Sequence, residues 1–149
     1  MIRRAELKDI PNLIELGREF ITEGSWGWTY SEENAAKSFF TCISSPDYAI
    51  LISEENDSLL GAVIVSYEND FQVDNVGDIL EFYVSKKGRG KGVGRELLKA
   101  ACDWFDEHNC VHVFTKATAN IGSQGKAFQN LFVKFGFCVF SDVLVRGVK

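Results

Sequence analysis

A glycine-rich turn, in which every second residue from 88 to 94 is glycine, lies between a predicted strand and a predicted helix. Glycine adopts positive φ easily and lets a ligand approach the backbone closely. The first amides of a helix have no partner within it, and the helix dipole makes this end positive. Arg89, Lys91 and Arg95 add positive charge to the turn. The pattern therefore predicts a binding site for the phosphates of a ligand.

Three phosphate-binding motifs compete for this turn. A Walker A loop needs Ser or Thr after Gly-Lys to hold magnesium, whereas Arg95 follows the last glycine here. A dinucleotide fingerprint does not fit glycines at every second position, and it needs an acid after the next strand, where Lys116 stands. The third pattern, Arg-x-x-Gly-x-Gly, is met in full by Arg89, Gly92 and Gly94. We therefore favour the third motif.

The hydrophobic pattern predicts elements in the order β-α-α-β-β-β-α-β-α-β. The predicted strands are 2–5, 48–53, 59–67, 77–84, 111–115 and 137–148, the last as one strand or a hairpin. The predicted helices are about 10–21, 31–43, 95–105 and 123–134. This order is typical of an α/β or α+β layered domain with a mixed sheet, and 149 residues suit one domain over 1–149.

Charge is unevenly distributed along the chain, whose net charge is −5. Five of the 16 basic residues lie within 86–95, a segment that contains no acidic residue. The other 11 basic residues face 21 acidic ones, a net charge of −10. We infer an anionic ligand at the basic segment and a cationic one elsewhere, or else a solvated lysine-rich turn. The acidic body argues against a nucleic-acid partner.

Composition excludes several other classes. The four cysteines lie far apart without a C-x-x-C pair, and His108 and His112 have no metal-ligand spacing, so we expect neither disulfides nor a metal site. No apolar stretch approaches the roughly 20 residues that span a membrane, and no signal-peptide pattern opens the chain. We therefore expect a cytoplasmic protein with no membrane partner.

Two segments resemble a known family. The stretch from Leu80 to Leu98, with the glycine turn inside it, resembles motif A of the GNAT superfamily of N-acetyltransferases. The sequence Leu131-Phe-Val-Lys-Phe-Gly-Phe137 is similar to a second, helix-ending signature of that superfamily. The order of elements matches over essentially the whole chain. The resemblance implies the GNAT fold in three layers, and acetyl-CoA as the co-substrate.

The resemblance also implies where the cofactor binds. The pantetheine would run between the strand that ends at Val84 and the strand that ends near Thr115, with the Val84 backbone at the thioester carbonyl. Asn120 resembles an asparagine that often bonds the pantetheine. The diphosphate would lie on the amides of 89–95. The full set of expected cofactor-binding residues is Phe82, Tyr83, Val84, Arg89, Gly90, Lys91, Gly92, Val93, Gly94, Arg95, Asn120 and Phe132.

Acetyl transfer to an amine needs a base, because an alkylammonium with a pKa near 10.4 has no free lone pair at neutral pH. In the family such acids often lie on the strand before motif A, where this chain has Asp78 and Glu81. Three residues apart, they point to opposite faces of a regular strand, which a bulge near Val84 would alter. We favour Glu81 over Asp78. Each could instead be a rim carboxylate or a salt-bridge partner.

The family's usual proton donor is a tyrosine in the second signature, and Phe132 stands at that position. A phenyl ring cannot protonate the leaving thiolate. A thiol of pKa near 8.5 leaves fairly well without help, and Tyr83, Tyr30 or water are alternative donors.

Acceptor specificity is expected in the loop between the first two helices. Glu23 with acids of the 68–78 region would attract a cation, and Trp26, Trp28 and Tyr30 would form an aromatic wall. These aromatics could equally belong to the core or to a homodimer interface.

The predicted function is therefore acetyl transfer from acetyl-CoA to a primary amine of a cationic small molecule or peptide, by direct attack. The alternative is a CoA-binding module with weak or no transferase activity, which the phenylalanine at 132 suggests. A transferase directed at tRNA or the ribosome is disfavoured by the acidic body.

Overall fold

The computed structural model describes residues 1–24, 27–69, 74–116 and 122–140. Its strands are β1 (Ile2–Arg4), β2 (Tyr48–Glu55), β3 (Ser58–Glu68), β4 (Asn75–Val84) and β5 (Cys110–Thr115). Its α-helices are α1 (Ile10–Gly24), α2 (Glu32–Ser44), α3 (Val93–Glu107) and α4 (Gly122–Lys134). Two short 3₁₀ turns are η1 (Leu7–Asp9) and η2 (Lys86–Gly88).

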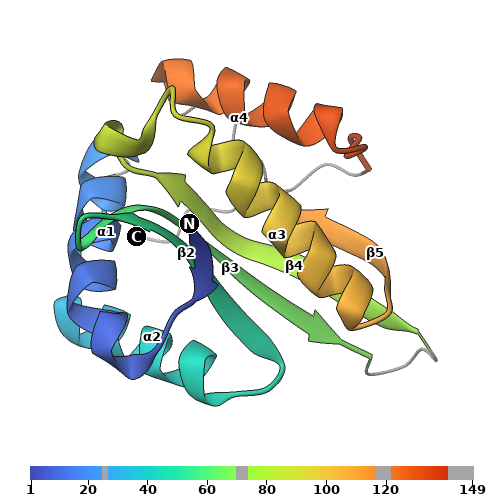
Figure 1. The fold of residues 1–149 in the computed structure, drawn as a ribbon, viewed down its shortest axis with the longest axis horizontal. Helices are drawn as coiled ribbons and strands as arrows, with labels where there is room; N and C mark the ends of the chain where they lie inside the picture. The colour runs from blue at the N-terminus through green and yellow to red at the C-terminus, as the bar shows by residue number, and fades with distance from the viewer. Residues whose placement is uncertain (25–26, 70–73, 117–121, 141–149) are drawn as a thin grey trace.

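The strands form one mixed sheet in the order β1-β2-β3-β4-β5. Neighbours from β1 to β4 pair antiparallel, whereas β5 pairs parallel to β4. The parallel pair needs a crossover, and α3 provides it. In Figure 1, α3 crosses one face of the sheet, and α1 and α2 lie together away from α3.

Each face of the sheet is covered by helices. The apolar stripe of α3, including Leu97, Leu98 and Phe105, packs on Val63, Val65 and other residues of the sheet to form the larger core. On the opposite face, Leu13 of α1 and residues of α2 pack against Ile50 and Ile52 of β2. Two cores on two faces of one sheet confirm the three-layer fold predicted from the sequence.

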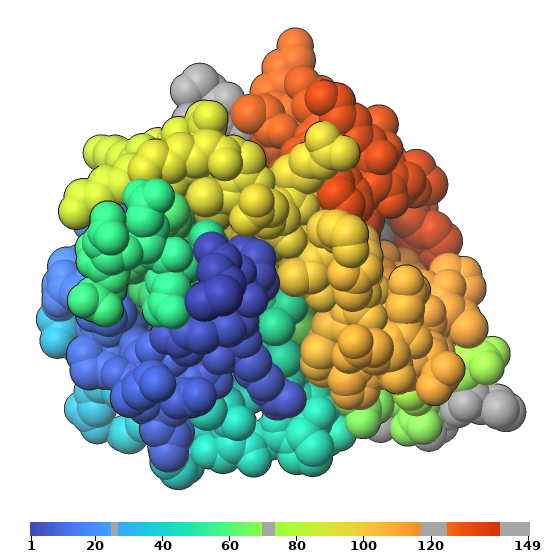
Figure 2. Space-filling view, in the orientation of Figure 1, coloured from blue at the N-terminus to red at the C-terminus, as the bar shows by residue number. Residues whose placement is uncertain are grey.

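The observed order of elements from β1 to α4 confirms the predicted order. The predicted last strand or hairpin at 137–148 has a different outcome. Residues 137–140 have no regular secondary structure, and 141–149 lie outside the described residues. In the space-filling view of Figure 2, α3 (yellow to gold) lies at the surface between the N-terminal part of the chain (blue and green) and α4 (orange).

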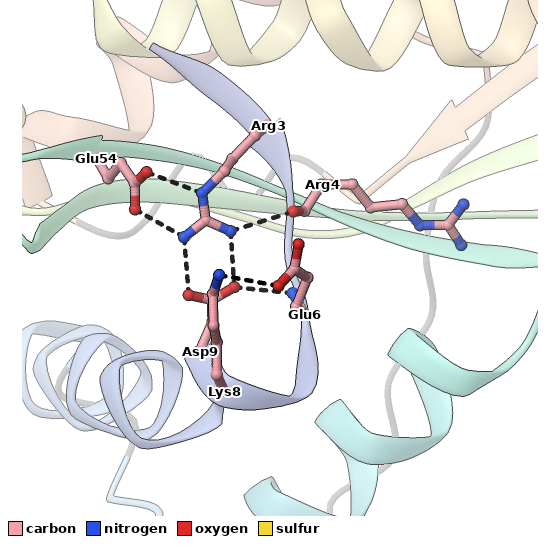
Figure 3. A network of polar contacts seen from close by, with 6 residues as sticks. All are labelled: Arg3, Arg4, Glu6, Lys8, Asp9 and Glu54. Carbon is pink, nitrogen blue, oxygen red and sulfur yellow. Dashed lines mark hydrogen bonds and ion pairs between the residues drawn. The ribbon is translucent and has the colours of Figure 1, made fainter.

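An ion-pair network joins β1, η1 and β2 at the start of the chain (Figure 3). Arg3 Nη1 and Nη2 bind the two carboxylate oxygens of Asp9 at 2.8 Å each. Its Nε and Nη2 bind Glu54 at 2.8 and 2.7 Å. Asp9 is 5% exposed, and the backbone N–H of Glu6 also donates to it. The network fixes the start of α1 against the edge of the sheet.

Candidate active site

The candidate site begins where β4 and β5 separate. Their pairing ends at Ile79 and Thr115, although β4 continues to Val84. The segment 80–84 therefore has β3 on one side and no strand partner on the other among the described residues. The expected gap between these two strands is present.

Backbone polar groups face this gap. The Ser85 N–H donates to the Leu60 carbonyl, and the Tyr83 carbonyl lies on the same, β3 side. Because these groups alternate along a strand, those of Phe82 and Val84 point to the opposite side, toward the gap. Two N–H groups and two carbonyls of β4 are thus available to a ligand between the strands.

A β-bulge at Leu80 changes the faces of the acidic residues. Glu81 is paired with Ile64 and Ile79 with Val65, so β4 has one residue more than β3 at this point. The extra residue shifts the alternation, and Asp78, opposite Ser66, comes onto the same face as Glu81. The opposite faces expected of a regular strand are therefore not observed, because β4 is irregular between the two acids; the bulge lies at Leu80, whereas the one considered from the sequence would lie near Val84. Both carboxylates lie on the face covered by α1 and α2.

The glycine turn has the backbone shape expected of an anion site. Gly90 and Gly92 have φ of 74° and 81°, and nothing lies within 4 Å of where their Cβ atoms would be. Gly92 is the N-cap of α3, and Glu96 is the first residue whose N–H bonds back to it. The amides of Val93, Gly94 and Arg95 are accordingly left at the helix start without a partner inside the helix.

A cleft of about 700 Å³ joins the glycine turn to the gap beside β4. Its walls come from β4, the glycine turn, the end of α1 and α4. The residues that line it and that the sequence predicted are Glu23, Trp28, Glu81, Phe82, Tyr83, Val84, Arg89, Gly90, Gly92, Val93, Gly94 and Arg95. The structure thus brings most of the predicted site into one cavity.

The two candidate bases have different surroundings. Glu81 lines the cleft with an exposed side chain, and the protein around it displaces enough water to raise the pKa of its carboxyl. Burial also raises the pKa of Asp78, although Lys116 opposes the shift and Glu68 adds to it. Asp78 does not line the cleft. Of the two, only Glu81 is placed to meet a ligand there.

Arg89 is held by an acidic residue of α1. Its Nη2 lies 2.7 and 2.6 Å from the two carboxylate oxygens of Glu23, and its guanidinium lies 5.8 Å from the centre of the Tyr83 ring. The pKa of Glu23 is lowered: burial acts to raise it, but the hydrogen bonds from Arg89 and Tyr83 outweigh burial. The buried Nε of Arg89 has no hydrogen-bond partner in the described part of the chain.

The Tyr83 hydroxyl lies between two carboxylates, 3.0 Å from Glu19 and 2.7 Å from Glu23. Burial, followed by these two hydrogen bonds, raises the pKa of Tyr83 far above its usual value. A phenol in these surroundings keeps its proton, because its anion would be buried beside two negative charges. Tyr83 is therefore poorly suited to replace the missing tyrosine as a proton donor.

Several predicted site residues lie elsewhere. Lys91 pairs with Glu55 at 2.9 Å and does not line the cleft. The Tyr30 hydroxyl donates to the Ile14 carbonyl, so this ring packs on α1 and forms no cleft wall. Phe132 is 2% exposed and packs in the core, because its ring has no polar group to keep at a surface. Trp26 and Asn120 lie outside the described residues.

Sequence reasoning missed two residues of α1. The Phe20 ring lines the cleft 5.3 Å from the Tyr83 ring, and Glu19 accepts from the Lys86 N–H at 2.8 Å. The signal was the helical spacing of Glu19 and Glu23, four residues apart, which places both on one side of α1. Phe20 follows the helical spacing of the apolar residues of α1, and this spacing does not distinguish a cleft wall from the core.

The gap between β4 and β5, the glycine turn and the cleft lie together in one three-layer α/β domain. The chain belongs to the acetyltransferase (GNAT) family, whose model matches residues 14–137. It is an acetyl-CoA-dependent N-acetyltransferase of that family.

Three similar proteins share no more than 26% of their residues with this chain. An uncharacterised N-acetyltransferase of Archaeoglobus fulgidus is 26% identical over 111 residues, which cover 72% of this chain and 75% of that protein. A "predicted acetyltransferase" of Clostridium acetobutylicum, solved with acetyl-CoA, has a TM-score of 0.80 at 20% identity, covering 99% and 95% of the two chains. An aminoglycoside acetyltransferase from an uncultured soil metagenomic sample, solved with sisomicin, has a TM-score of 0.75 at 16% identity, covering 100% and 96%. These structures share the fold.

Two searches of the described residues were negative. Within 1–24, 27–69, 74–116 and 122–140, no three His, Cys, Asp or Glu side chains gather where they could hold a metal ion. No helix in the same residues is both long and apolar enough to cross a membrane.

Proposed function

We propose that this protein transfers the acetyl group of acetyl-CoA to a primary amine of a cationic small molecule or peptide by direct attack. The observation that carries this proposal is the position of Glu81: it is exposed in the cleft, on the segment of β4 whose edge away from β3 has no strand partner among the described residues. A carboxylate at that point can receive the proton of an amine whose nitrogen approaches the β4 edge.

The residues around the cleft fit the donor. The αL glycines leave open space at the turn, and the amides of Val93, Gly94 and Arg95 suit a diphosphate. The backbone groups of Phe82 and Val84 suit the amides of pantetheine and the carbonyl of a thioester. When bound, acetyl-CoA supplies the activated acyl group, and the N–H groups of β4 would stabilise negative charge on its oxygen.

Glu81 would act as general base. Removing a proton from an alkylammonium at pH 7 costs about 4–5 kcal/mol, since its pKa is near 10.4. The surroundings that raise the pKa of Glu81 bring it closer to that of the amine and make the carboxylate a better proton acceptor. A positioned base of this kind contributes typically about 10²–10⁴-fold.

The leaving sulfur would depart as a thiolate and take its proton from solvent. The buried ring of Phe132 has no acidic proton. The Tyr83 hydroxyl retains its proton because it lies between two carboxylates. A thiol with a pKa near 8.5 needs little assistance at neutral pH. The same phenylalanine favours the second candidate function, a CoA-binding module with weak or no transfer.

The charged and aromatic residues of the cleft indicate the chemical class of the acceptor. The cleft is lined by two carboxylates, Glu81 and Glu23, and by three cations, Arg89, Arg95 and Lys116. Glu81 forms no ion pair among the described residues, and together with the aromatic surface of Phe20 and Trp28 it suits a cation with an apolar part. The aminoglycoside enzyme with the same fold was solved with sisomicin, so this architecture accommodates a small-molecule ligand. A second structure with the fold is a ribosomal-protein-alanine N-acetyltransferase of Brucella melitensis, with a TM-score of 0.76 at 17% identity over 99% of both chains. A peptide amine therefore belongs in the same test.

The experiment measures thiol release with DTNB, using acetyl-CoA and a panel of small-molecule and peptide amines. The transferase proposal expects CoA release with cationic primary amines and none with the corresponding N-acetylated compounds. Calorimetry with CoA is run in parallel. Tight CoA binding without release by any amine would contradict the transferase and support the binding module.

A further inference from the structure

Glu19 and Glu23 of α1 converge on one hydroxyl group, that of Tyr83. A hydroxyl has a single proton, so it can donate to only one of the two carboxylates at a time. Carboxylates four residues apart on a helix repel each other unless other groups neutralise them. Here the Lys86 N–H donates to Glu19, and the Arg89 guanidinium binds Glu23. Among the described residues, Arg89 is the only cation that forms an ion pair with either carboxylate, and the more distant charge of Lys86 also lowers the pKa of Glu23.

Arg89 uses little of its bonding capacity on this pair. One nitrogen, Nη2, makes both contacts to Glu23, while the buried Nε has no partner in the described part of the chain. A guanidinium carries five N–H donors and binds phosphate oxygens well through two of them. Arg89 also precedes Gly90 in the glycine turn and lines the cleft. A diphosphate on the turn therefore competes with Glu23 for the same guanidinium.

We propose that Arg89 exchanges Glu23 for the diphosphate of the donor, and that the released Glu23 carboxylate, with Glu19 one turn before it on α1, binds a second cationic group of the acceptor. This exchange rests on the proposed function and names its substrate class. The acceptor is a diamine, a polyamine or another molecule with a second ammonium group, several bonds away from the nitrogen that is acetylated.

The positions in the cleft match such an acceptor. Glu81 and Tyr83 are two residues apart on the same face of β4, so their Cα atoms are about 7 Å apart. Glu23 meets the Tyr83 hydroxyl at the far end of that ring. An extended acceptor can present one amine to Glu81 and a second to Glu23, with its carbon chain along Phe20.

The exchange couples the two ligands. If the donor uncovers the site for the second ammonium, the donor raises the affinity for the acceptor, and by reciprocity the acceptor raises the affinity for the donor. The single ammonium of a monoamine can bind either at Glu81 or at Glu23 but cannot reach both, so a monoamine should raise donor affinity much less than a diamine.

The experiment is calorimetry of CoA binding, with 1,4-diaminobutane or 1-aminobutane present at high concentration. In the wild type, the diamine should tighten CoA binding about fivefold or more, and the monoamine should not. Glu23→Gln should bind CoA several-fold more tightly without any amine, because Arg89 is no longer held, and should lose the diamine effect. Glu15→Gln is the matched control, since it removes an exposed carboxylate of the same helix that pairs with Arg18. It should keep the diamine effect.

Thermal melts of both variants check that they remain folded. Equal CoA affinity of wild type and Glu23→Gln, or a diamine effect that survives in Glu23→Gln, would overturn the exchange and leave the transferase proposal standing. If CoA does not bind to the wild type at all, the proposed function fails, and the exchange fails with it.

Discussion

At the scale of single residues, Asp78 and Glu81 differ in what surrounds them, although the bulge brings both to one face of β4. Glu81 lines the cleft, whereas Asp78 lies outside it near Lys116 and Glu68. This difference favours Glu81 as the base, and it leaves Asp78 as a carboxylate that interacts with neighbouring charges outside the cleft. The sequence alone gave little basis for choosing between Glu81 and Asp78 as the base.

Glu81→Gln keeps the shape of the side chain and removes its capacity to accept a proton. We expect kcat to fall about 10²–10³-fold with CoA affinity unchanged, because the change removes a general base and no donor contact. In the wild type, kcat/KM should fall as pH drops through the raised pKa of Glu81. That acidic limb should disappear in the variant. Steady-state kinetics from pH 5 to pH 9 measure both effects.

Asp78→Asn is the matched comparison for this base assignment. It should retain most of the activity and the acidic limb. If Glu81→Gln keeps kcat within threefold of the wild type and Asp78→Asn loses most of its kcat, then Asp78 and not Glu81 is the general base.

At the scale of elements, the junction of the glycine turn with α3 is where we propose that the donor diphosphate binds. Gly92 has φ of 81° and ψ of 0°, the αL conformation, which Asn and Asp tolerate better than other residues with a side chain. Gly92→Asn and Gly92→Asp therefore have nearly the same backbone strain and shape, and differ in one negative charge.

We expect Gly92→Asp to bind CoA at least tenfold more weakly than Gly92→Asn, a difference of about 1.4 kcal/mol or more. The reason is repulsion between the carboxylate and the diphosphate at the start of α3. Calorimetry at low and high salt is the measurement. The difference in CoA affinity between the two variants should be smaller at high salt, because salt screens the repulsion. Equal affinities at low salt would place the diphosphate away from this turn.

At the scale of the whole molecule, the Arg3 network fixes the N-terminal layer to the sheet. The hydrogen bonds from Arg3 hold the pKa of Asp9 at about 2, below its ordinary value of 3.8. A depressed folded-state pKa contributes stability that is complete above about pH 4 and is lost as pH falls toward 2. The Arg3 and Glu54 side chains are 26% and 29% exposed, and the water around them screens the charges of the network. We therefore expect the ionised Asp9 to contribute about 1–2 kcal/mol to the free energy of unfolding.

Asp9→Asn should lower the free energy of unfolding by that amount at pH 7, and the difference from the wild type should shrink between pH 4 and pH 2. Urea denaturation at several pH values is the measurement. Glu33→Gln, which breaks an exposed pair with Lys37, should cost less than about 0.5 kcal/mol at every pH. A loss at Asp9 that is the same at pH 2 and pH 7 would rule out the ion pair as its source.

Prediction from sequence worked where the signal is local. The glycine turn, the helix that follows it and the order of elements all depend on patterns within a few residues. The Arg89–Glu23 pair joins residues 66 positions apart, and no local pattern indicates such a contact. The bulge at Leu80 depends on how β3 and β4 align, which hydrophobic alternation does not specify. For Phe132, the motif indicated a place beside the cofactor, but packing with Phe82 and Phe128 decides its position.

The bulge at Leu80 also determines how β4 responds to changes in its length. It depends on β4 having one residue more than β3 and not on the type of the surplus residue, so substitutions at 80 should leave it largely intact. Deleting residue 80 should restore one-to-one pairing of β4 with β3 and keep Asp78 and Glu81 on one face. The shared face of the two acids therefore follows from their partners on β3 and not from their spacing along the chain.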